Sequence, residues 1–396
     1  MGRVVLRKGK VKPVWLGHPW VFRGAIAEVR GEPETGEIVV VEDAMGKTMG
    51  RGFWHRDSVI AVRVLPSDGG ERIDAAWVRG RVDRALRLRG EILQLPNDQT
   101  NAYRLINSEG DGFPGVVADV FGDTVAVGFT SYGAWRLRED VYDAIESALS
   151  PRAVVEVDIG AHKAEGIPIG PRVVRGDLGK DGAVAYRQSG LDLSLRLPGG
   201  QKTGAYLDQR ENRERIASLA KGRRVLDLHC HHGGFALTAA AAGASQAVGV
   251  DSSSPAIEVA KANATNNGLA EAVSFVMGDV HRFLKGAAEA NERFDIVLVD
   301  PPPMARSRAH VEQALRAHRA LHGAALEVLS KDGLLLVASC TSAIGHDPLG
   351  RALVEAARER GRAVQVIEWR GASADHPVRL PCVEGRYLSA LLCRVE

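Results

Sequence analysis

The chain has 396 residues, 45% of them hydrophobic and 25% charged, and its net charge is only +2. These fractions are typical of a globular protein, and the length predicts two or three domains. No apolar run is long enough to cross a bilayer, and no apolar core follows the basic first residues, so we expect a cytoplasmic protein with no membrane association. The four cysteines show no paired spacing, which indicates neither a disulfide framework nor a zinc knuckle.

The N-terminal segment is strand-like and basic. Short alternating runs at 37–41 and 59–65 predict a small all-β module. Basic and aromatic residues gather ahead of the first acid, Glu28, and they suit RNA phosphates and stacked bases; they are Arg3, Arg7, Lys8, Lys10, Lys12, Trp15, His18, Trp20 and Phe22. An ordinary solvated face over a few core aromatics is the alternative.

A second segment follows a predicted linker at 66–70. A helix is expected over 74–95, and its arginines either meet RNA phosphates or form a solvated face; they are Arg79, Arg81, Arg84, Arg87 and Arg89. Strands around glycine-rich turns, a helix over 135–149 and a strand over 153–157 then predict a small α+β unit. The alternating run 186–197 predicts a hairpin.

The second half of the chain begins with a nucleotide-binding pattern. An apolar strand at 225–228 leads through Gly233 and Gly234 into an alanine-rich helix, and a second apolar strand at 246–250 ends in Asp251. Strand, glycine turn, helix, strand and acid form the first half of a doubly wound sheet, in which the acid can accept both ribose hydroxyls. The pattern predicts a cofactor of the adenosine type.

Three further residues follow apolar strands of the same predicted sheet. Asp279 either accepts a hydrogen bond from an adenine amino group or caps the next helix. Asp300 begins an Asp-Pro-Pro-Pro run, and Cys340 ends the strand 334–339, so both lie at the carboxyl edge where ligands bind. A thiolate and an acid in one pocket suit attack on a pyrimidine, with the cysteine adding to C6 and the acid supporting N3.

The chain resembles the class I S-adenosylmethionine-dependent methyltransferases that act on cytosine C5 of bacterial large-subunit ribosomal RNA, the RlmI-like group, over nearly its whole length. The block from Gln201 to Arg210, Gln-Lys-Thr-Gly-Ala-Tyr-Leu-Asp-Gln-Arg, is the most specific. Leu6-Arg-Lys-Gly and Gly17-His-Pro-Trp-Val-Phe resemble the family's PUA domain, and Tyr103-Arg-Leu-Ile resembles its central domain. Ser339-Cys340 and Ala374-Asp-His-Pro377 also match.

The resemblance implies three domains: a PUA-like RNA-binding β domain at 1–68, a central α+β domain at 72–185, and a hairpin with a Rossmann-like methyltransferase domain at 186–396. It implies 5-methylcytosine as product and large-subunit ribosomal RNA as partner, and it leaves a homodimer open. Cys340 and Asp300 would be catalytic, and Arg7, Lys8, Lys10 and Trp20 would bind RNA. The expected S-adenosylmethionine contacts are Arg210, Asp227, His229, Cys230, Gly233, Phe235, Asp251, Ser252, Gly278, Asp279, Asp300 and Pro301.

The chain departs from the family pattern in three loops, one of which has Pro303-Met304 after Asp-Pro-Pro where the family has Lys-Phe. His229-Cys-His-His replaces the usual Phe-Cys-Tyr-Thr, and Thr-Ser-Ala follows Cys340 where the family has Ser-His-His. Four neighbouring residues on one tight loop cannot easily surround a tetrahedral ion, so we predict no metal and expect the loop to wrap the methionine part of the donor. A methyltransferase for another base and a non-catalytic protein that binds RNA and the donor stay open.

Two other enzyme classes fit the residues less well. A nicotinamide dehydrogenase shares the glycine turn and Asp251, but it needs neither Cys340 nor the basic β module. An amino-group methyltransferase usually has an aromatic residue after its Pro-Pro, and this chain has Pro303.

Overall fold

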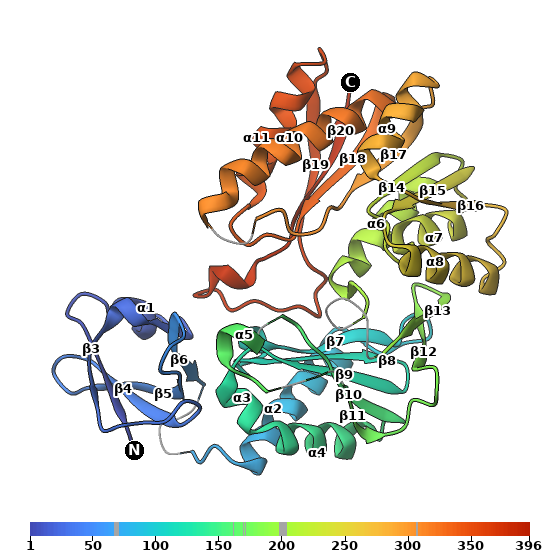
Figure 1. Ribbon diagram of the computed structural model, residues 1–396. Coiled ribbons are helices and arrows are strands. Elements are labelled where there is room, and N and C mark those ends of the chain that lie inside the picture. The colour runs from blue at the N-terminus through green and yellow to red at the C-terminus, as the bar shows by residue number, and fades with distance from the viewer. Residues whose placement is uncertain (67–70, 161, 169, 171, 198–203, 306–307) are drawn as a thin grey trace. The chain divides into compact units, whose positions relative to one another are not determined.

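The computed structural model describes residues 1–66, 71–160, 162–168, 170, 172–197, 204–305 and 308–396. The chain divides into two compact units (Figure 1). Unit 1 comprises Met1–Arg187, Leu195–Leu207 and Ala374–Gly385, and unit 2 comprises Gln188–Ser194, Asp208–Ser373 and Arg386–Glu396. Among the described residues, no helix is long and apolar enough to cross a bilayer.

Unit 1 begins with a six-stranded sheet in the order β2-β6-β5-β4-β1-β3. Alternate residues of these strands point inward, and Val4, Leu6, Val39 and Val41 form its core with Trp54. A four-residue helix, α1, interrupts the otherwise all-β module. The elements are β1 (Arg3–Leu6), α1 (Lys12–Trp15), β2 (Trp20–Phe22), β3 (Ile26–Arg30), β4 (Ile38–Glu42), β5 (Thr48–Trp54) and β6 (Ile60–Leu65).

A five-stranded sheet in the order β11-β10-β9-β8-β7 follows in unit 1, with α2 and α4 in contact with each other beside it (Figure 1). Residues 67–70 of the predicted linker lie outside the described residues. The elements are α2 (Ala75–Arg87), β7 (Ala102–Asn107), β8 (Val116–Phe121), β9 (Thr124–Phe129), α3 (Tyr132–Arg136), α4 (Arg138–Leu149), β10 (Ala153–Glu156), α5 (His162–Glu165) and β11 (Arg172–Gly176).

The helix predicted over 74–95 is shorter than expected. Asp74 caps it by accepting hydrogen bonds from two backbone amides, α2 ends at Arg87, and a π-helical turn covers Leu88–Ile92. Arg79, Arg84 and Arg87 are exposed, as on a solvated face. Arg81 and Arg89 are buried, so the prediction that they could meet RNA phosphates is wrong for these two.

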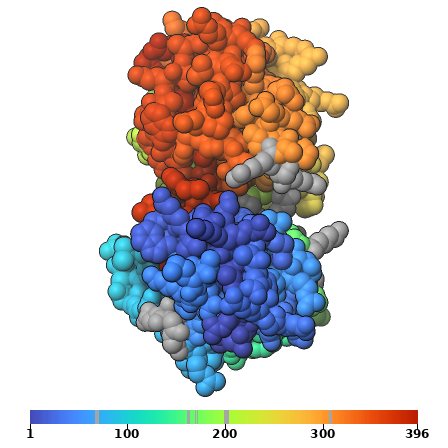
Figure 2. All heavy atoms as spheres, turned by 90° about the vertical axis from the view of Figure 1, so that its left-hand side faces the viewer, coloured from blue at the N-terminus to red at the C-terminus, as the bar shows by residue number. Residues whose placement is uncertain are grey.

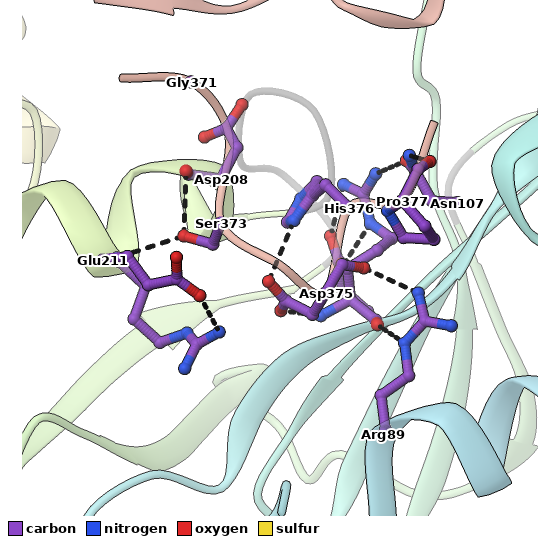
Figure 3. Close-up of polar contacts among 12 residues, drawn as sticks. Arg89, Asn107, Asp208, Glu211, Gly371, Ser373, Asp375, His376 and Pro377 are labelled. Carbon is purple, nitrogen blue, oxygen red and sulfur yellow. Dashed lines mark hydrogen bonds and ion pairs between the residues drawn. The ribbon is translucent and has the colours of Figure 1, made fainter. Parts of the chain in front are cut away.

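Unit 1 is completed by a segment from near the end of the chain, Ala374–Gly385, which we call the C-terminal strap. Buried Asp375 accepts a hydrogen bond from the Arg104 backbone amide at 2.8 Å, and its carbonyl accepts one from the Arg89 guanidinium at 2.6 Å (Figure 3). The Pro377 carbonyl accepts a hydrogen bond from the Asn107 amide at 3.0 Å. The strap therefore supplies hydrogen-bond acceptors for donors on β7 and on the π-helical turn after α2.

Asp375→Ala is expected to lower the free energy of unfolding of unit 1 by roughly 2–4 kcal/mol, because it leaves the Arg104 amide and the His376 imidazole without their buried acceptor. Denaturant titration with tryptophan fluorescence measures this change, since all the tryptophans except Trp369 lie in unit 1. Asp177→Ala, at an exposed turn, is the control and should change the midpoint little. Equal midpoints for the two variants would contradict a stabilising role of the strap.

Unit 2 is a doubly wound α/β domain with a seven-stranded sheet in the order β16-β15-β14-β17-β18-β20-β19. The first five of these strands are parallel, and β20 runs antiparallel to both β18 and β19. The strand order reverses between β14 and β17, which is where such sheets bind ligands. The strands are β14 (Arg224–Leu228), β15 (Gln246–Asp251), β16 (Val273–Met277), β17 (Phe294–Val299), β18 (Leu329–Ser339), β19 (Val364–Arg370) and β20 (Ser389–Val395).

One face of this sheet packs against α9, α10 and α11 around a large apolar core. The predicted hairpin is also confirmed, as β12 (Ala183–Gln188) pairs with β13 (Leu191–Arg196). The helices of unit 2 are α6 (Arg210–Ala220), α7 (Gly234–Ala241), α8 (Ser254–Asn266), α9 (Val280–Glu289), α10 (Val311–Val328) and α11 (His346–Arg358).

Two histidines on α10, His318 and His322, are buried with their rings 5.4 Å apart. Burial lowers the pKa of His318 to about 4 and that of His322 to about 3, so both are neutral in the folded protein at pH 7. The unfolded chain binds protons more readily than the folded protein, so protonation of these histidines favours unfolding. Their contribution to the free energy of unfolding is fully present above the unfolded pKa of about 6.5 and is lost as the pH falls toward the folded pKa values. For each histidine the loss is about 1.4 kcal/mol for every unit by which its folded and unfolded pKa values differ.

His322→Leu is therefore expected to reduce the acid sensitivity of unit 2. Its unfolding midpoint in urea should fall less than that of the wild type between about pH 6.5 and 4, as followed by circular dichroism. Parallel pH dependences in the two proteins would contradict this assignment. His310→Leu is a control at an exposed position.

Candidate functional site

The turn after β14 leaves no room for a side chain at Gly233. Gly233 has a φ of 77°, and a Cβ there would lie 2.5 Å from the Phe275 ring. His229 and His231, before it, also have positive φ values, of 62° and 49°. Glycine is thus required at 233 by the positive φ and by the packing of the turn against Phe275, as in the tight strand-to-helix turns of nucleotide-binding folds.

Asp251, at the end of β15, holds this turn in place. Its carboxylate accepts hydrogen bonds from the backbone amides of His231, at 2.9 Å, and Ser253, at 2.8 Å. Each carboxylate oxygen can accept further bonds, so Asp251 can also bind a pair of ribose hydroxyls. Ser252 is exposed, and its neighbour Ser253 caps α8.

Asp227 is buried within β14, one residue before the strand ends. Its carboxylate accepts a hydrogen bond from the Ala236 amide at 3.1 Å, at the start of α7. Burial, with smaller contributions from the nearby carboxylates of Asp300 and Asp251, raises the pKa of Asp227 to about 7. Arg213 acts in the opposite direction, so this guanidinium is part of the electrostatics of the site.

Asp279 has the second of the two roles predicted for it, that of a helix cap. It is exposed and caps α9, because its carboxylate accepts a hydrogen bond from the Arg282 amide at 2.9 Å. The preceding Gly278 donates its amide to the Asp251 carbonyl at 2.9 Å, which ties the ends of β15 and β16 together.

Asp300 and Cys340 end the adjacent parallel strands β17 and β18, as their positions in the sequence predict. The Cys340 sulfur lies 3.9 Å from the Pro301 carbonyl oxygen, which places the thiol beside the Asp-Pro-Pro turn. Both Cys340 and Asp300 are half-buried, whereas Pro301 is buried. An acid and a thiol therefore share the edge of the sheet at which the strand order reverses.

The histidine-rich loop is packed rather than open. His231 and His232 stack with their ring centres 3.8 Å apart, and burial lowers the pKa of His232 to about 3. Burial also lowers the pKa of His229 and raises that of the Cys230 thiol well above its usual range. At neutral pH the side chains of His229, Cys230 and His232 are thus uncharged.

Among the described residues, one group brings three metal-ligand types together, and it lies in unit 1: His18, Cys382 and Glu384. The His18 Nδ1 accepts a hydrogen bond from the Trp20 amide at 3.1 Å, so the proton of a neutral ring is on Nε2. That nitrogen lies 3.3 Å from the Glu384 carboxylate and donates to it. The cluster is thus a hydrogen-bonded pair beside a buried thiol.

The most specific sequence block lies partly outside the described residues, because 201–203 are not described. Arg210 is buried at the start of α6, with its guanidinium 3.5 Å from Glu211. Three neighbours that the sequence reading missed also belong to this site: Gln209, which donates to Asp300 at 2.8 Å, Asn212, which donates to Gln209, and Arg213, which lies over the ring of buried Phe235. The available signal was that Gln209 belongs to that block and that Asn212 and Arg213 follow it within three residues.

The predicted RNA-binding residues all belong to the N-terminal module, which forms much of one face of unit 1 (Figure 2): Arg7, Lys8 and Lys10 lie between β1 and α1, and Trp20 begins β2. Arg7, Lys8 and Lys10 are exposed. Trp20 is half-buried, and its indole donates to Glu109 at 2.7 Å, so it is less available for stacking than expected. Trp15, 66% exposed, offers a more accessible aromatic ring.

Comparisons with known proteins give one consistent result. Residues 4–66 match the PUA-like domain family, and residues 183–394 match the family described as S-adenosylmethionine-dependent methyltransferase. The chain is 35% identical over 393 residues to ribosomal RNA large subunit methyltransferase I of Tolumonas auensis, covering 99% of this chain and 98% of that protein. It is 34% identical over 395 residues to the protein of the same name from Salmonella typhimurium, covering 99% and 97%.

Solved structures confirm the predicted fold. A methyltransferase solved in complex with S-adenosylhomocysteine matches with a TM-score of 0.86 and 19% identity over the whole of both chains. A methyltransferase from Streptococcus mutans matches with a TM-score of 0.84 and 18% identity, again over both whole chains. The prediction of a PUA-like module ahead of a Rossmann-like methyltransferase domain that uses S-adenosylmethionine is therefore confirmed.

Proposed function

Because the chain belongs to the S-adenosylmethionine-dependent ribosomal RNA large subunit methyltransferases, we propose that it methylates C5 of a cytosine through a covalent adduct with Cys340. The observation that supports this chemistry most directly is the approach of the Cys340 sulfur to the Asp300-Pro301 turn. We also propose the domain limits 1–68, 72–185 and 186–396, and a cytoplasmic location, where the RNA is available.

The donor would bind over the glycine turn. S-adenosylmethionine supplies an electrophilic methyl group. We assign the ribose hydroxyls to Asp251, whose carboxylate also holds the turn at His231, and the backbone contacts to the tight turn at Gly233, while Asp227 fixes the start of α7. Around them we assign to the same cofactor Arg210, His229, Cys230, Phe235, Ser252, Gly278, Asp279, Asp300 and Pro301.

The target cytosine would be flipped toward the ends of β17 and β18. The Cys340 thiolate would attack C6 and form a carbon–sulfur bond, while Asp300, in its protonated form, would donate its proton toward N3, where the negative charge develops. C5 then carries the electron pair that takes the methyl group. A base removes the proton from C5, the electrons return to the ring, and the bond to Cys340 breaks.

Arg7, Lys8, Lys10 and Trp20 are proposed to bind the RNA. The first three are exposed cations, which contribute affinity for phosphates independent of sequence. Their replacement should weaken RNA binding and reduce its salt dependence without changing which base is methylated.

Transfer of labelled methyl from S-adenosylmethionine to ribosomal RNA from cells that lack this protein tests the proposed function. Label in 5-methylcytosine would support it. Label in another base would overturn the mechanism and retain the enzyme class. Donor binding without label in RNA or in ribosomal subunits would favour a non-catalytic protein.

A further inference from the structure

A chain of buried hydrogen bonds in unit 2 ends on the acid of the site. Gln209 and Asn212, which are 2% and 1% exposed, lie between Arg370 at the end of β19 and Asp300 at the end of β17. The Arg370 Nε donates to the Asn212 Oδ1 at 2.6 Å, and the Asn212 Nδ2 donates to the Gln209 Oε1 at 2.5 Å. The Gln209 Nε2 then donates to the Asp300 Oδ2 at 2.8 Å.

The direction of these bonds is not arbitrary. A guanidinium has only donors, so the Asn212 atom that faces Arg370 must be its oxygen. The nitrogen of the same amide also donates to the Gly371 carbonyl at 3.1 Å, and a carbonyl can only accept. A flipped Asn212 would set its nitrogen against the Arg370 donor and its oxygen against the Gly371 carbonyl oxygen, which would leave buried polar groups unsatisfied.

The orientation of Asn212 then determines that of Gln209. Since the Asn212 amide nitrogen faces Gln209, the Gln209 oxygen accepts there and its nitrogen is turned toward Asp300. The Asp300 Oδ2 is consequently an acceptor in every protonation state, and a proton carried by this carboxyl group is confined to Oδ1.

We propose that Gln209 is a positioning residue for the methyl transfer, and that Arg370 and Asn212 set its polarity, so that Asp300 presents a defined oxygen to the target base. An acid that supports N3 of a pyrimidine must offer its proton or its lone pair from one fixed oxygen. The chain of amides achieves this without placing a further charge beside Asp300. The inference rests on the proposed function for the identity of the base only.

Asn212→Asp is the sharpest test, because it preserves size and the contact with Arg370 but replaces the donor that faces Gln209 by an acceptor. Gln209 must then turn its nitrogen to the new carboxylate and its oxygen to Asp300, which has to carry a proton on Oδ2. We expect kcat to fall about 10²-fold, the low end of what a positioned acid or base contributes, with donor affinity unchanged. Where the pH–rate profile depends on the ionisation of Asp300, the corresponding midpoint should move to higher pH, because the rotated Gln209 favours the protonated form of Asp300.

Gln209→Met provides a second variant of similar volume that removes the hydrogen bond to Asp300, and it should lower kcat and displace the profile in the same direction. Glu368→Gln is the control, since Glu368 pairs with Arg370 without belonging to the chain of amides. Its kcat and profile should match those of the wild type.

An unshifted profile in both Asn212→Asp and Gln209→Met would overturn the proposal, even with reduced kcat, because packing alone would then explain the loss. If the wild type methylates a base other than cytosine, the proposed function fails, and the same comparison on that RNA still decides the role of Gln209.

If the wild type transfers no methyl group, the role of Gln209 is tested by NMR of the carboxyl carbons in protein labelled at its aspartates. The Asp300 signal is assigned by its loss in Asp300→Asn. The Asp300 titration should lie at higher pH in Asn212→Asp than in the wild type. Equal titrations would overturn the proposal.

Discussion

Cys340→Ala is expected to lower methyl transfer to RNA by at least about 10³-fold, because removal of a nucleophile leaves only the contributions of binding and electrostatics. Donor affinity should stay within about twofold of the wild type, since the mutation removes one sulfur atom and no charged contact with the nucleotide turn. Filter-bound label and calorimetric titration with S-adenosylmethionine measure the two quantities separately.

RNA that contains 5-fluorocytidine tests the covalent step independently. Its C5 carries fluorine where cytosine carries a proton, so the last elimination cannot occur and the adduct with the enzyme should accumulate. The adduct should form with the wild type and not with Cys340→Ala. Cys393→Ala is a suitable control, because Cys393 is fully buried in β20 and burial raises the pKa of its thiol to about 12. Wild-type turnover by Cys340→Ala would exclude Cys340 as the nucleophile.

Asp251→Ala should reduce the affinity for S-adenosylmethionine by about 10²- to 10³-fold, on the basis of about 1.5–3 kcal/mol for each hydrogen bond to a charged group. The loss has two causes. The ribose would lose its acceptor, and the amides of His231 and Ser253 would lose the carboxylate that fixes the turn. Calorimetric titration at one ionic strength measures the change.

Asp279→Ala is the matched control for this measurement. Asp279 is exposed and caps α9, so its replacement should cost about 1 kcal/mol of stability, with a smaller loss of affinity than at Asp251. If the two variants bind the donor equally well, the ribose contact does not belong to Asp251.

The nucleotide half of the site could be predicted because its signals are local. The strand that ends at Leu228, the turn at Gly233, α7 and the acid at Asp251 follow one another within a single βαβ unit, and each has a recognisable residue pattern. The positions of Asp300 and Cys340 at one edge also follow from the rule that parallel strands end together.

The partners of these residues could not be predicted in the same way. Arg370 meets Asn212 across 158 positions, and Asp375 meets the Arg104 amide across 271. No periodicity or spacing encodes such contacts, since they arise only when sheets and loops pack. Arg89 was misread for the same reason: on the helix it resembles its exposed neighbours, and only the central sheet and the strap bury it.

The strap also determines when unit 1 can be finished during synthesis. The residues that pair with Arg89 and Arg104 lie between β19 and β20, close to the C-terminus, so a nascent chain cannot complete its first unit until nearly all of the protein has left the ribosome. Until then the buried arginines of that unit lack part of their acceptors. The sheet of unit 2 needs β20, which follows the strap in the chain, so neither unit is complete before the last residues are made, and a truncated product would have neither unit intact.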